Sequence, residues 1–575
     1  MEQKGVSRRD FNKATVAAVG SMALSRTAVG GKGDAGQGPR RPYNIVLVMC
    51  DQESHHLQPA DGYRLPAREE LRRRGTTFAH HYIAAAMCTP SRGAMFSGQP
   101  PQVNGVFDQM ELGYVPSLDK HRPSMGTIMR GLGYETAFYG KFELRRDIIY
   151  PKDTVNYSEA LVEYGFNAFA PDGDKVGAPD QGYDTDDYTV SEGNRWLRTH
   201  AHDLNRQGKP WFLLISMVSP HDIMYADANT PGSRVQVSPV GAQITRPPEN
   251  SIYERKWQFP LSASRLEPLT GPGKPNAQRE YLEGWSYWLG TIPADNAEMW
   301  QVFYNYYLNL IRDNDDTLAT LWATLGELDL WENTIVIQTA DHGELAGSHG
   351  GLRGKGPFPY EQQTHVPFVV AHPDVRGGGT CQAVTSHIDL IPTLVGLTGL
   401  SEADRRAATK DLPGVDFSPW IAKADQAKAD SVRPGALFNY VGLQTIDANY
   451  LKKIAPLQAH GKPAPPLSEL HPDLGKRGFL NFVFDGRYKF ARYYAPNQFN
   501  TPRDLDAIFR DNDCELFDLE ADPHEMNNLA IDPREHRHVI LRLNALLNDL
   551  MAQEVGPNDG QFLPAPVRPA MPVRT

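Results

Sequence analysis

The sequence predicts an α/β fold, with a large, mostly parallel or mixed sheet flanked by helices and a smaller C-terminal α+β domain. Two observations predict it. Continuous apolar segments, typical of strands buried on both faces, alternate with helical stretches, and this alternation favours a parallel sheet covered by helices. A later hairpin pattern indicates a second, smaller sheet. The chain has 575 residues, which is long enough for roughly two to four domains.

The strands of the large sheet are expected at three apolar segments, Asn44–Met49, Phe212–Val218 and Thr334–Thr339. Each is short, rich in Val, Ile or Leu, and followed by polar residues, as buried strands are. Helices are expected between them at Tyr63–Arg74 and Asn296–Leu328. In the longer of these two, apolar residues recur at mixed three- and four-residue spacing, which is typical of a helix with one buried side.

Reactive side chains follow each of the three strands. The sequences at the strand ends are Cys50-Asp51-Gln52, Ser219-Pro220-His221 and Asp341-His342-Gly343. Because ligands of such sheets bind beyond the carboxyl ends of the strands, these groups should converge on one edge. One Asp at a strand end is more often a helix cap, but three such endings together predict a metal or catalytic site.

Charge and cysteine content exclude several classes of protein. The net charge is −11, from 58 Lys and Arg against 69 Asp and Glu, and no basic block indicates a nucleic-acid partner. The fractions of hydrophobic residues (40%) and charged residues (22%) are typical of a globular enzyme. Four cysteines without a CxxC pair argue against a disulfide scaffold and a zinc knuckle: Cys50, Cys88, Cys381 and Cys514.

Residues 1–40 are predicted to be an export signal followed by a flexible joint. Ser7–Lys13 contains an arginine pair and precedes the short apolar run Ala14–Leu24, a pattern that indicates the twin-arginine route. The alternative is a basic, Ala-rich start of a cytosolic chain. Arg26 interrupts the apolar run well short of the roughly 20 residues that span a bilayer, so an anchor is not expected. The sequence therefore predicts a periplasmic or secreted protein carried by the twin-arginine translocase.

A fourth element, Cys88–Phe96, places a thiol at the start of a helix. Thr89 is a plausible N-cap, and Pro90 suits the first helical position. The positive end of a helix dipole lowers the pKa of a thiol and favours a bound anion, so Cys88 is a candidate reactive group. Taken alone, a cysteine is more often a small buried hydrophobic residue.

The element Cys88-Thr89-Pro90-Ser91-Arg92-Gly93 resembles the signature of the sulfatase family within the alkaline-phosphatase-like superfamily. Further stretches resemble the family in the same order along the chain: Asn44–Gln52, Gly131–Lys141, Asp341–Glu344 with His349-Gly350 and Lys355-Gly356, Ser386–Leu394, and Glu515–Leu519 with Asp522-Pro523 and Asn528-Leu529. The resemblance covers about 42–535.

The resemblance implies a sulfatase that acts through a modified cysteine. In this family the signature cysteine is oxidised by a formylglycine-generating enzyme, so Cys88 is expected to become formylglycine. One hydroxyl of its hydrate attacks the sulfur of a sulfate monoester, and the second later expels sulfate. The resemblance implies that Arg92 holds the formylglycine hydroxyl and that Lys141 and Lys355 neutralise the sulfate oxygens. It also implies that His221 donates a proton to the leaving oxygen.

The resemblance also implies one divalent metal ion. The residues carried over as ligands are Asp51, Gln52, Asp341, His342 and the formylglycine derived from Cys88. Ca²⁺ is the metal expected from the family, while the imidazole of His342 moves the preference toward Mn²⁺, Zn²⁺ or Fe²⁺. The Asp-Gln/Asp-His set resembles the phosphonate monoester hydrolase and choline-sulfatase branches.

One position departs from the family pattern. Gly140-Lys141-Phe142-Glu143-Leu144 places Glu143 where the family usually has a histidine. An ionised carboxylate there would repel the anionic substrate unless it is paired or held protonated. This departure bears on the class of substrate more than on the fold.

The remaining chain divides around the catalytic region. We expect a catalytic domain at 41–430, a smaller domain at 431–555 with a hairpin around Asp485-Gly486, and a flexible tail at 556–575. The segments Trp257–Trp288 and Leu451–Leu474 are predicted to be loops that frame the pocket.

Three functions fit these observations. The leading one is hydrolysis of a small-molecule or saccharide sulfate monoester. The alternative enzyme is a phosphodiester or phosphonate monoester hydrolase, because the same site chemistry serves either anion. The third is a binding protein whose Cys88 is never oxidised. The cost of burying several charges without a metal and an anion argues against this third reading.

Overall fold

The computed structural model describes residues 42–57, 61–149, 156–169 and 173–570. The predicted export signal and joint at 1–40 lie outside these ranges. The described residues form one compact unit, and the division expected at about 430 stays a prediction. Among the described residues, no helix combines the length and the hydropathy that crossing a bilayer requires.

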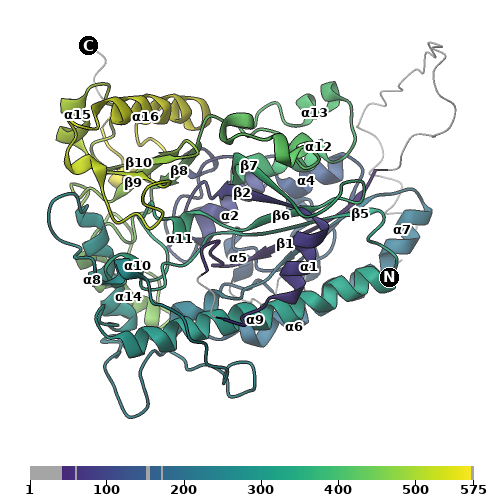
Figure 1. Cartoon of the computed structure of the whole chain (residues 1–575), viewed down its shortest axis with the longest axis horizontal. Coiled ribbons are helices and arrows are strands. Elements are labelled where there is room, and N and C mark those ends of the chain that lie inside the picture. The colour runs from purple at the N-terminus through teal and green to yellow at the C-terminus, as the bar shows by residue number, and fades with distance from the viewer. Residues whose placement is uncertain (1–41, 58–60, 150–155, 170–172, 571–575) are drawn as a thin grey trace, which may run out of the picture. The chain divides into compact units, whose positions relative to one another are not determined.

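A seven-stranded sheet forms the centre of the molecule (Figure 1). In spatial order its strands are β3 (Glu135–Gly140), β4 (Trp211–Ser216), β1 (Asn44–Cys50), β5 (Thr334–Ala340), β6 (Phe368–Ala371), β2 (Thr76–Tyr82) and β7 (Gly379–Ser386). The first four are parallel to one another, and β2 is parallel to β7. Only β6 runs antiparallel to its neighbours. The sheet is therefore mixed and mostly parallel, as predicted.

Helices cover both faces of this sheet. The central strand β1 accordingly has apolar side chains on both of its faces. Ile45 and Leu47 belong to a core that contains residues of α2 (Cys88–Ser97), α4 (Met125–Gly131) and α12 (Leu390–Gly396). Val46 and Val48 belong to a second core with α1 (Pro66–Arg74), α6 (Gln181–Trp196) and α9 (Ala297–Glu327). Figure 1 shows the long α9 running beneath the sheet. The predicted strands and the two predicted helices are present, with ends shifted by a few residues.

A smaller antiparallel sheet follows, in the order β11 (Asp513–Asp518), β10 (Tyr488–Tyr494), β9 (Phe479–Phe484) and β8 (Ala436–Tyr440). The predicted hairpin is confirmed, because β9 and β10 pair antiparallel on either side of Asp485-Gly486. Apolar residues of α16 (Arg537–Leu550) pack against this sheet. Shorter helices join these elements: α3 (Pro101–Asn104), α5 (Arg146–Ile149), α7 (His202–Arg206), α10 (Ser348–Gly351), α11 (Glu361–Thr364), α13 (Glu402–Ala408) and α15 (Leu505–Asp511).

Three segments differ from the sequence prediction. The two segments predicted as loops contain the helices α8 (Asn276–Leu289) and α14 (Ala448–Ala459). Pro456 lies inside α14, and the prolines around it suggested a loop although the preceding turns are helical. In the tail after 556, Leu563 and Val567 are buried against residues of β9 and β10, so this part of it is packed.

Candidate active site

The register of the large sheet brings two acidic residues together. Because β1 and β5 are parallel and pair Cys50 with Ala340, the residues that follow, Asp51 and Asp341, leave adjacent strands at the same edge. Both carboxylates are fully buried. The convergence predicted from the separate strand ends is therefore present.

The next two strands add a lysine to the same edge. Gly140 ends β3 and pairs with Ser216, the last residue of β4, so Lys141 follows directly beside them. Gly140 has a φ of +104°, and a Cβ there would lie 1.9 Å from the Ser216 carbonyl oxygen, so only glycine fits. Lys141 Nζ lies 2.7 Å from Asp51 Oδ2.

Cys88 is the first residue of α2 and faces these groups. Its Sγ lies 3.1 Å from His342 Nε2 and donates to Asp51 Oδ1 at 3.8 Å. Burial and the nearby Asp51 charge raise the pKa of the Cys88 thiol, so the expectation that the helix end lowers it is wrong. The expected Thr89 cap is also wrong: Thr89 lies within α2, where its hydroxyl accepts from the Met110 amide.

Four side chains offer donor atoms to one point. Asp51, Cys88, Asp341 and His342 each provide an atom within 4.8 Å of the other three. His342 Nδ1 donates to the Gly343 carbonyl at 3.0 Å, which leaves the lone pair of Nε2 directed at the cluster. Two carboxylates and an outward-facing imidazole lone pair form a donor set that fits a divalent cation.

Arg92 lies behind this cluster and holds both carboxylates. Its Nε donates to Asp341 Oδ2 at 2.9 Å and one Nη to Asp51 Oδ2 at 3.0 Å. The other Nη donates to the Lys141 carbonyl and to Ser216 Oγ. These four hydrogen bonds orient the two carboxylates, the Lys141 carbonyl and Ser216, and the contact between Arg92 and the modified Cys88 that the resemblance implied stays a prediction.

The two carboxylates differ in their electrostatic setting. Burial opposes ionisation of Asp51, but the charges of Lys141 and Arg92 outweigh it and hold the pKa of Asp51 well below the usual range. Burial and repulsion from Asp51 raise the pKa of Asp341. Bringing a cation close to both carboxylates would therefore favour the ionised form of Asp341.

Gln52 and Lys355 lie beside the cluster but contact each other. Lys355 Nζ donates to Gln52 Oε1, and Gln52 Nε2 donates to Glu344 Oε2. The side-chain oxygen of Gln52 is thus engaged by an ammonium group, and its role as a metal ligand stays a prediction. Sequence reasoning assigned no role to Glu344, whose other oxygen accepts from the Ala346 and Gly354 amides and so fixes the loop that carries Lys355.

Glu143 lies inside the site, where the family usually has a histidine. It is buried, 3.2 Å from Lys141 Nζ and 3.7 Å from Arg92 Nε, and its oxygens accept no hydrogen bond from the described residues. Burial, only partly offset by Lys141, raises its pKa to about 7. Asp174, which the sequence did not single out, accepts from the Phe142 and Glu143 amides and holds this turn.

His221 begins a short 3₁₀ helix, His221–Tyr225, after β4. Its ring packs on Gly177, where a Cβ would lie 2.6 Å from the imidazole, and its Nδ1 has no partner within the described part of the chain. Burial and the charge of Lys355 hold the pKa of His221 well below its usual value, so the imidazole is neutral before an anion arrives.

A cavity of about 780 Å³ opens in front of these groups. Its wall includes His221 and Lys355 together with Met87, the neighbour of Cys88. The helices that replace the predicted loops supply much of the rest: Trp285 and Trp288 come from α8, Gln458 from α14, and Lys462 from the turn after it. Both segments frame the pocket as expected, the first through α8 and the second through α14 and the turn after it.

Comparison with known proteins gives the family. The sulfatase family profile matches residues 43–400. The choline-sulfatase of Rhizobium meliloti (strain 1021) is 25% identical, over 85% of this chain and 83% of its own. The solved structure of BT4656 with its substrate D-glucosamine-2-N,6-O-disulfate superposes with a TM-score of 0.62 at 17% identity, covering 91% of this chain and 100% of that one.

A second solved structure has a different activity. The phosphonate monoester hydrolase of Agrobacterium radiobacter superposes with a TM-score of 0.59 at 19% identity, covering 89% of this chain and 96% of its own. At such identities the superpositions establish the fold and not the substrate. The family profile extends over more than half of the chain and over every strand of the seven-stranded sheet. The chain therefore belongs to the sulfatase family and is a hydrolase of that family.

Proposed function

We propose that this protein hydrolyses sulfate monoesters and that its nucleophile is derived from Cys88 by oxidation to formylglycine. The observation that carries this proposal is the position of Cys88 Sγ at the start of α2, 3.1 Å from His342 Nε2 and beside Asp51. The raised pKa of this buried thiol makes the unmodified side chain a weak nucleophile at neutral pH. The sulfur occupies the place where a hydrated formylglycine would carry its hydroxyls, one to attack sulfur and one to expel sulfate.

A divalent cation held by Asp51, Asp341 and His342 completes the proposal. When bound, such an ion polarises a sulfuryl oxygen and favours the ionised form of a nearby hydroxyl. Ca²⁺ is the metal expected from the family, and the imidazole nitrogen of His342 supports Mn²⁺, Zn²⁺ or Fe²⁺. Arg92 acts as a positioning residue here, because it holds both carboxylates in place.

The remaining charges suit an anionic substrate. Lys141 and Lys355 would balance the sulfate oxygens, as fixed cations do for developing negative charge. His221 lies in the cavity wall and is the candidate proton donor to the leaving oxygen. Although its imidazole is neutral in these surroundings, a bound sulfate adds the negative charge that favours its protonation.

The cavity indicates the size of the alcohol. At about 780 Å³ it falls in the range that encloses a small organic molecule or a saccharide unit. Two tryptophans of α8, Trp285 and Trp288, give it broad apolar surfaces, while Gln458 and Lys462 add polar groups. These features support a sulfate ester of a saccharide or of another small alcohol.

Hydrolysis of a phosphonate monoester or phosphodiester is the second candidate. It is supported by the Asp51-Gln52 and Asp341-His342 pairs, which resemble those of the phosphonate monoester hydrolase branch, and by Glu143, which departs from the usual histidine. We expect aryl sulfate to give a higher kcat/KM than an aryl phosphodiester or an aryl phosphonate monoester under identical conditions. The reverse order would replace the sulfatase proposal with this second one.

The state of Cys88 separates both enzymes from a binding protein. Mass spectrometry of the peptide containing Cys88 should show the loss of mass expected when a thiol becomes an aldehyde. Unmodified Cys88 in active protein would refute the formylglycine proposal, and unmodified Cys88 in inactive protein would support a binding role. We further propose export through the twin-arginine route, on the strength of the arginine pair in Ser7–Lys13.

A further inference from the structure

A second group of metal-binding side chains lies outside the candidate active site. His56 lies in the loop after β1, while Glu361 and His365 lie at the start of α11 and just after its end. His56 Nε2 is 3.0 Å from Glu361 Oε2 and 3.0 Å from His365 Nδ1. The third side of this triangle, from His365 Nδ1 to Glu361 Oε2, is 2.7 Å. Three donor atoms from two segments therefore face one point.

Protons alone cannot satisfy this triangle. If only His365 Nδ1 carries hydrogen, the lone pairs of His56 Nε2 and Glu361 Oε2 face each other. If only His56 Nε2 carries hydrogen, the same conflict arises between His365 and Glu361 at 2.7 Å. If both nitrogens carry hydrogen, two donors oppose each other at 3.0 Å. Each arrangement leaves one repulsive contact, whereas a single cation between the three atoms removes them all.

The surroundings leave the inward atoms available for a cation. Glu361 uses its other oxygen, Oε1, to accept from Lys489 Nζ at 2.6 Å and from the Tyr82 hydroxyl at 2.7 Å. Lys489 holds the pKa of Glu361 well below its usual value against the opposing effect of burial, so the carboxylate is ionised. The His365 ring is stacked between His55, at 4.0 Å, and Tyr82, at 4.9 Å, which fixes the direction of Nδ1.

We propose that His56, Glu361 and His365 bind a divalent transition-metal ion, with Zn²⁺ as the best fit. Two imidazoles and one carboxylate form a ligand set typical of zinc, whereas Ca²⁺ and Mg²⁺ favour all-oxygen sets. In a tetrahedral zinc site with bonds of about 2.0–2.1 Å, the donor atoms lie about 3.3 Å apart. The present separations of 2.7–3.0 Å would need to widen by about 0.3–0.6 Å to reach this geometry.

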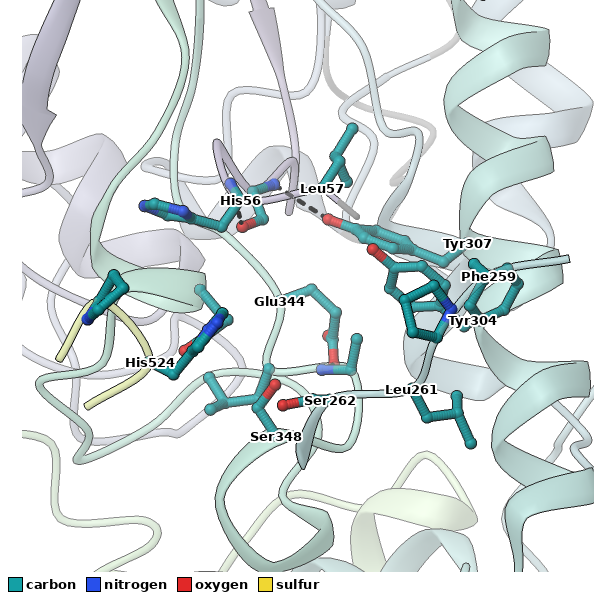
Figure 2. A pocket seen from close by; sticks show the side chains of 16 residues that line it. His56, Leu57, Phe259, Leu261, Ser262, Tyr304, Tyr307, Glu344, Ser348 and His524 are labelled. Carbon is teal, nitrogen blue, oxygen red and sulfur yellow. Dashed lines mark hydrogen bonds between the residues drawn. The ribbon is translucent and has the colours of Figure 1, made fainter. Parts of the chain in front are cut away.

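A fourth ligand can reach this ion from solvent. The side chain of His56 is 40% exposed, while those of Glu361 and His365 are 5% and 4% exposed. His56 also lines a pocket of about 180 Å³, where Figure 2 shows it, like His524, on the side opposite Tyr304 and Tyr307. A water molecule or a small anion from this side would complete a four-coordinate ion.

The proposed zinc would brace the loop after β1 against the segment that precedes β6. The His55 amide already donates to the His365 carbonyl at 3.1 Å, so the two segments are adjacent without the ion. Glu361 continues the connection to Lys489 on β10 of the smaller sheet. The site is separate from the proposed sulfate chemistry, and each can fail without the other.

The test counts zinc ions in the full-length protein. We expect wild type equilibrated with Zn²⁺ alone to hold one more ion per chain than His56→Ala. His56 is the residue to change because it is partly exposed and its loss leaves the Glu361–Lys489 pair intact. Second-site affinity should fall at least about 100-fold, since even outer-shell partners of a metal are worth 10–100-fold. His524→Ala, which removes another imidazole from the same pocket, should keep the full zinc content.

Two further measurements make the result decisive. Zn²⁺ should raise the thermal midpoint more in wild type than in His56→Ala, and Ca²⁺ alone should not reproduce this difference. Crystals of zinc-loaded protein should show an anomalous peak between the three donor atoms. Equal zinc content in wild type and His56→Ala, or zinc found only at Asp51 and Asp341, would overturn the proposal.

Discussion

Two buried charge clusters in this molecule are built from similar residues and differ in how completely they are satisfied. At the edge of the large sheet, Asp51, Asp341 and Glu143 share the cations Arg92 and Lys141. Burial and repulsion from Asp51 keep the pKa of Asp341 above its usual value, and Glu143 accepts no hydrogen bond from the described residues. Among the described residues, this cluster therefore contains a buried carboxylate without a hydrogen-bond donor.

The second cluster joins the two sheets, and its lysine, Lys489, has an acceptor for each of its three N–H donors; it is called the saturated cluster below. Lys489 Nζ, fully buried, donates to Glu361 Oε1 at 2.6 Å, to Glu525 Oε1 at 2.7 Å and to the Pro359 carbonyl at 2.8 Å. Glu525 Oε2 accepts from the Glu361 amide. A lysine with three acceptors holds the fold together, whereas unsatisfied carboxylates facing a cavity are available to a metal and a substrate.

The first way to test this contrast is to remove the reactive group of the unsatisfied cluster. Cys88→Ala should lower kcat for aryl sulfate on the order of 10⁴-fold or more, because the nucleophile is lost. The thermal midpoint should stay near that of wild type, since the buried charges are unchanged. Cys381→Ala, at a buried thiol distant from the site in sequence, should retain activity. Full turnover by Cys88→Ala, shown free of wild-type enzyme, would remove the mechanism.

The second test removes one carboxylate from each cluster. Asp51→Asn and Asp341→Asn should each lower the metal content of the site together with kcat, by roughly 10³-fold, because a Lewis acid is worth several kcal/mol. Glu525→Gln, in the saturated cluster, should leave the metal content of this site unchanged. Metal analysis alongside kinetics checks this prediction. Stoichiometric metal at this site in both Asp variants would contradict the ligand assignment.

The third test breaks the saturated cluster. Lys489→Met leaves Glu361 and Glu525 buried without their cation, so the free energy of unfolding should fall by about 3–5 kcal/mol. The kcat of the protein that remains folded should stay close to that of wild type. Lys452→Met is the matched control, because its pair with Glu283 is partly exposed and worth about 0.2–1 kcal/mol. Equal losses of stability in the two variants would mean that the buried lysine has no special structural role.

The unsatisfied cluster was also the more predictable of the two. Asp51, Asp341 and His342 follow strands that are visible as apolar runs, and the sheet rule alone brings their backbones to one edge. No local sequence pattern predicts the role of Lys489, whose partner Glu361 lies 128 positions away in the chain. The same is true of Asp174, which holds the turn at Glu143.

The pocket helices were missed for a local reason. Pro456 and the prolines after it suppressed the helical pattern of α14, although tertiary packing against α8 stabilises that helix. The pKa of Cys88 was predicted in the wrong direction because sequence shows the helix end but not the depth of burial, and burial has the larger effect here.

The fourth test asks which group in the cavity protonates the leaving oxygen. His221→Ala should lower kcat/KM for an alkyl sulfate about 100-fold and that for nitrophenyl sulfate far less, because an acidic alcohol leaves without a proton donor. Comparing the two substrates in wild type, His221→Ala and Lys355→Ala checks this. Equal losses for both substrates in His221→Ala would mean that His221 positions the anion. A selective loss in Lys355→Ala would then identify Lys355 as the donor.

The smallest effect is expected at Glu143, where the unsatisfied cluster meets the substrate. Its pKa is raised to about 7, so the carboxyl is protonated and neutral below this pH and ionised above it. Ionised Glu143 would compete with sulfate for Lys141 and repel the anion, so kcat/KM of wild type should fall as the pH rises through about 7. Glu143→Gln keeps the shape of the side chain but cannot ionise. From pH 6 to pH 8.5, the kcat/KM of wild type should therefore fall about tenfold more than that of Glu143→Gln, which corresponds to about 1.4 kcal/mol. If the pH profiles of the two proteins are parallel, the fall in kcat/KM above about pH 7 belongs to another group. Glu143 would then be a partner of Lys141 and Arg92 that does not change its charge over this range.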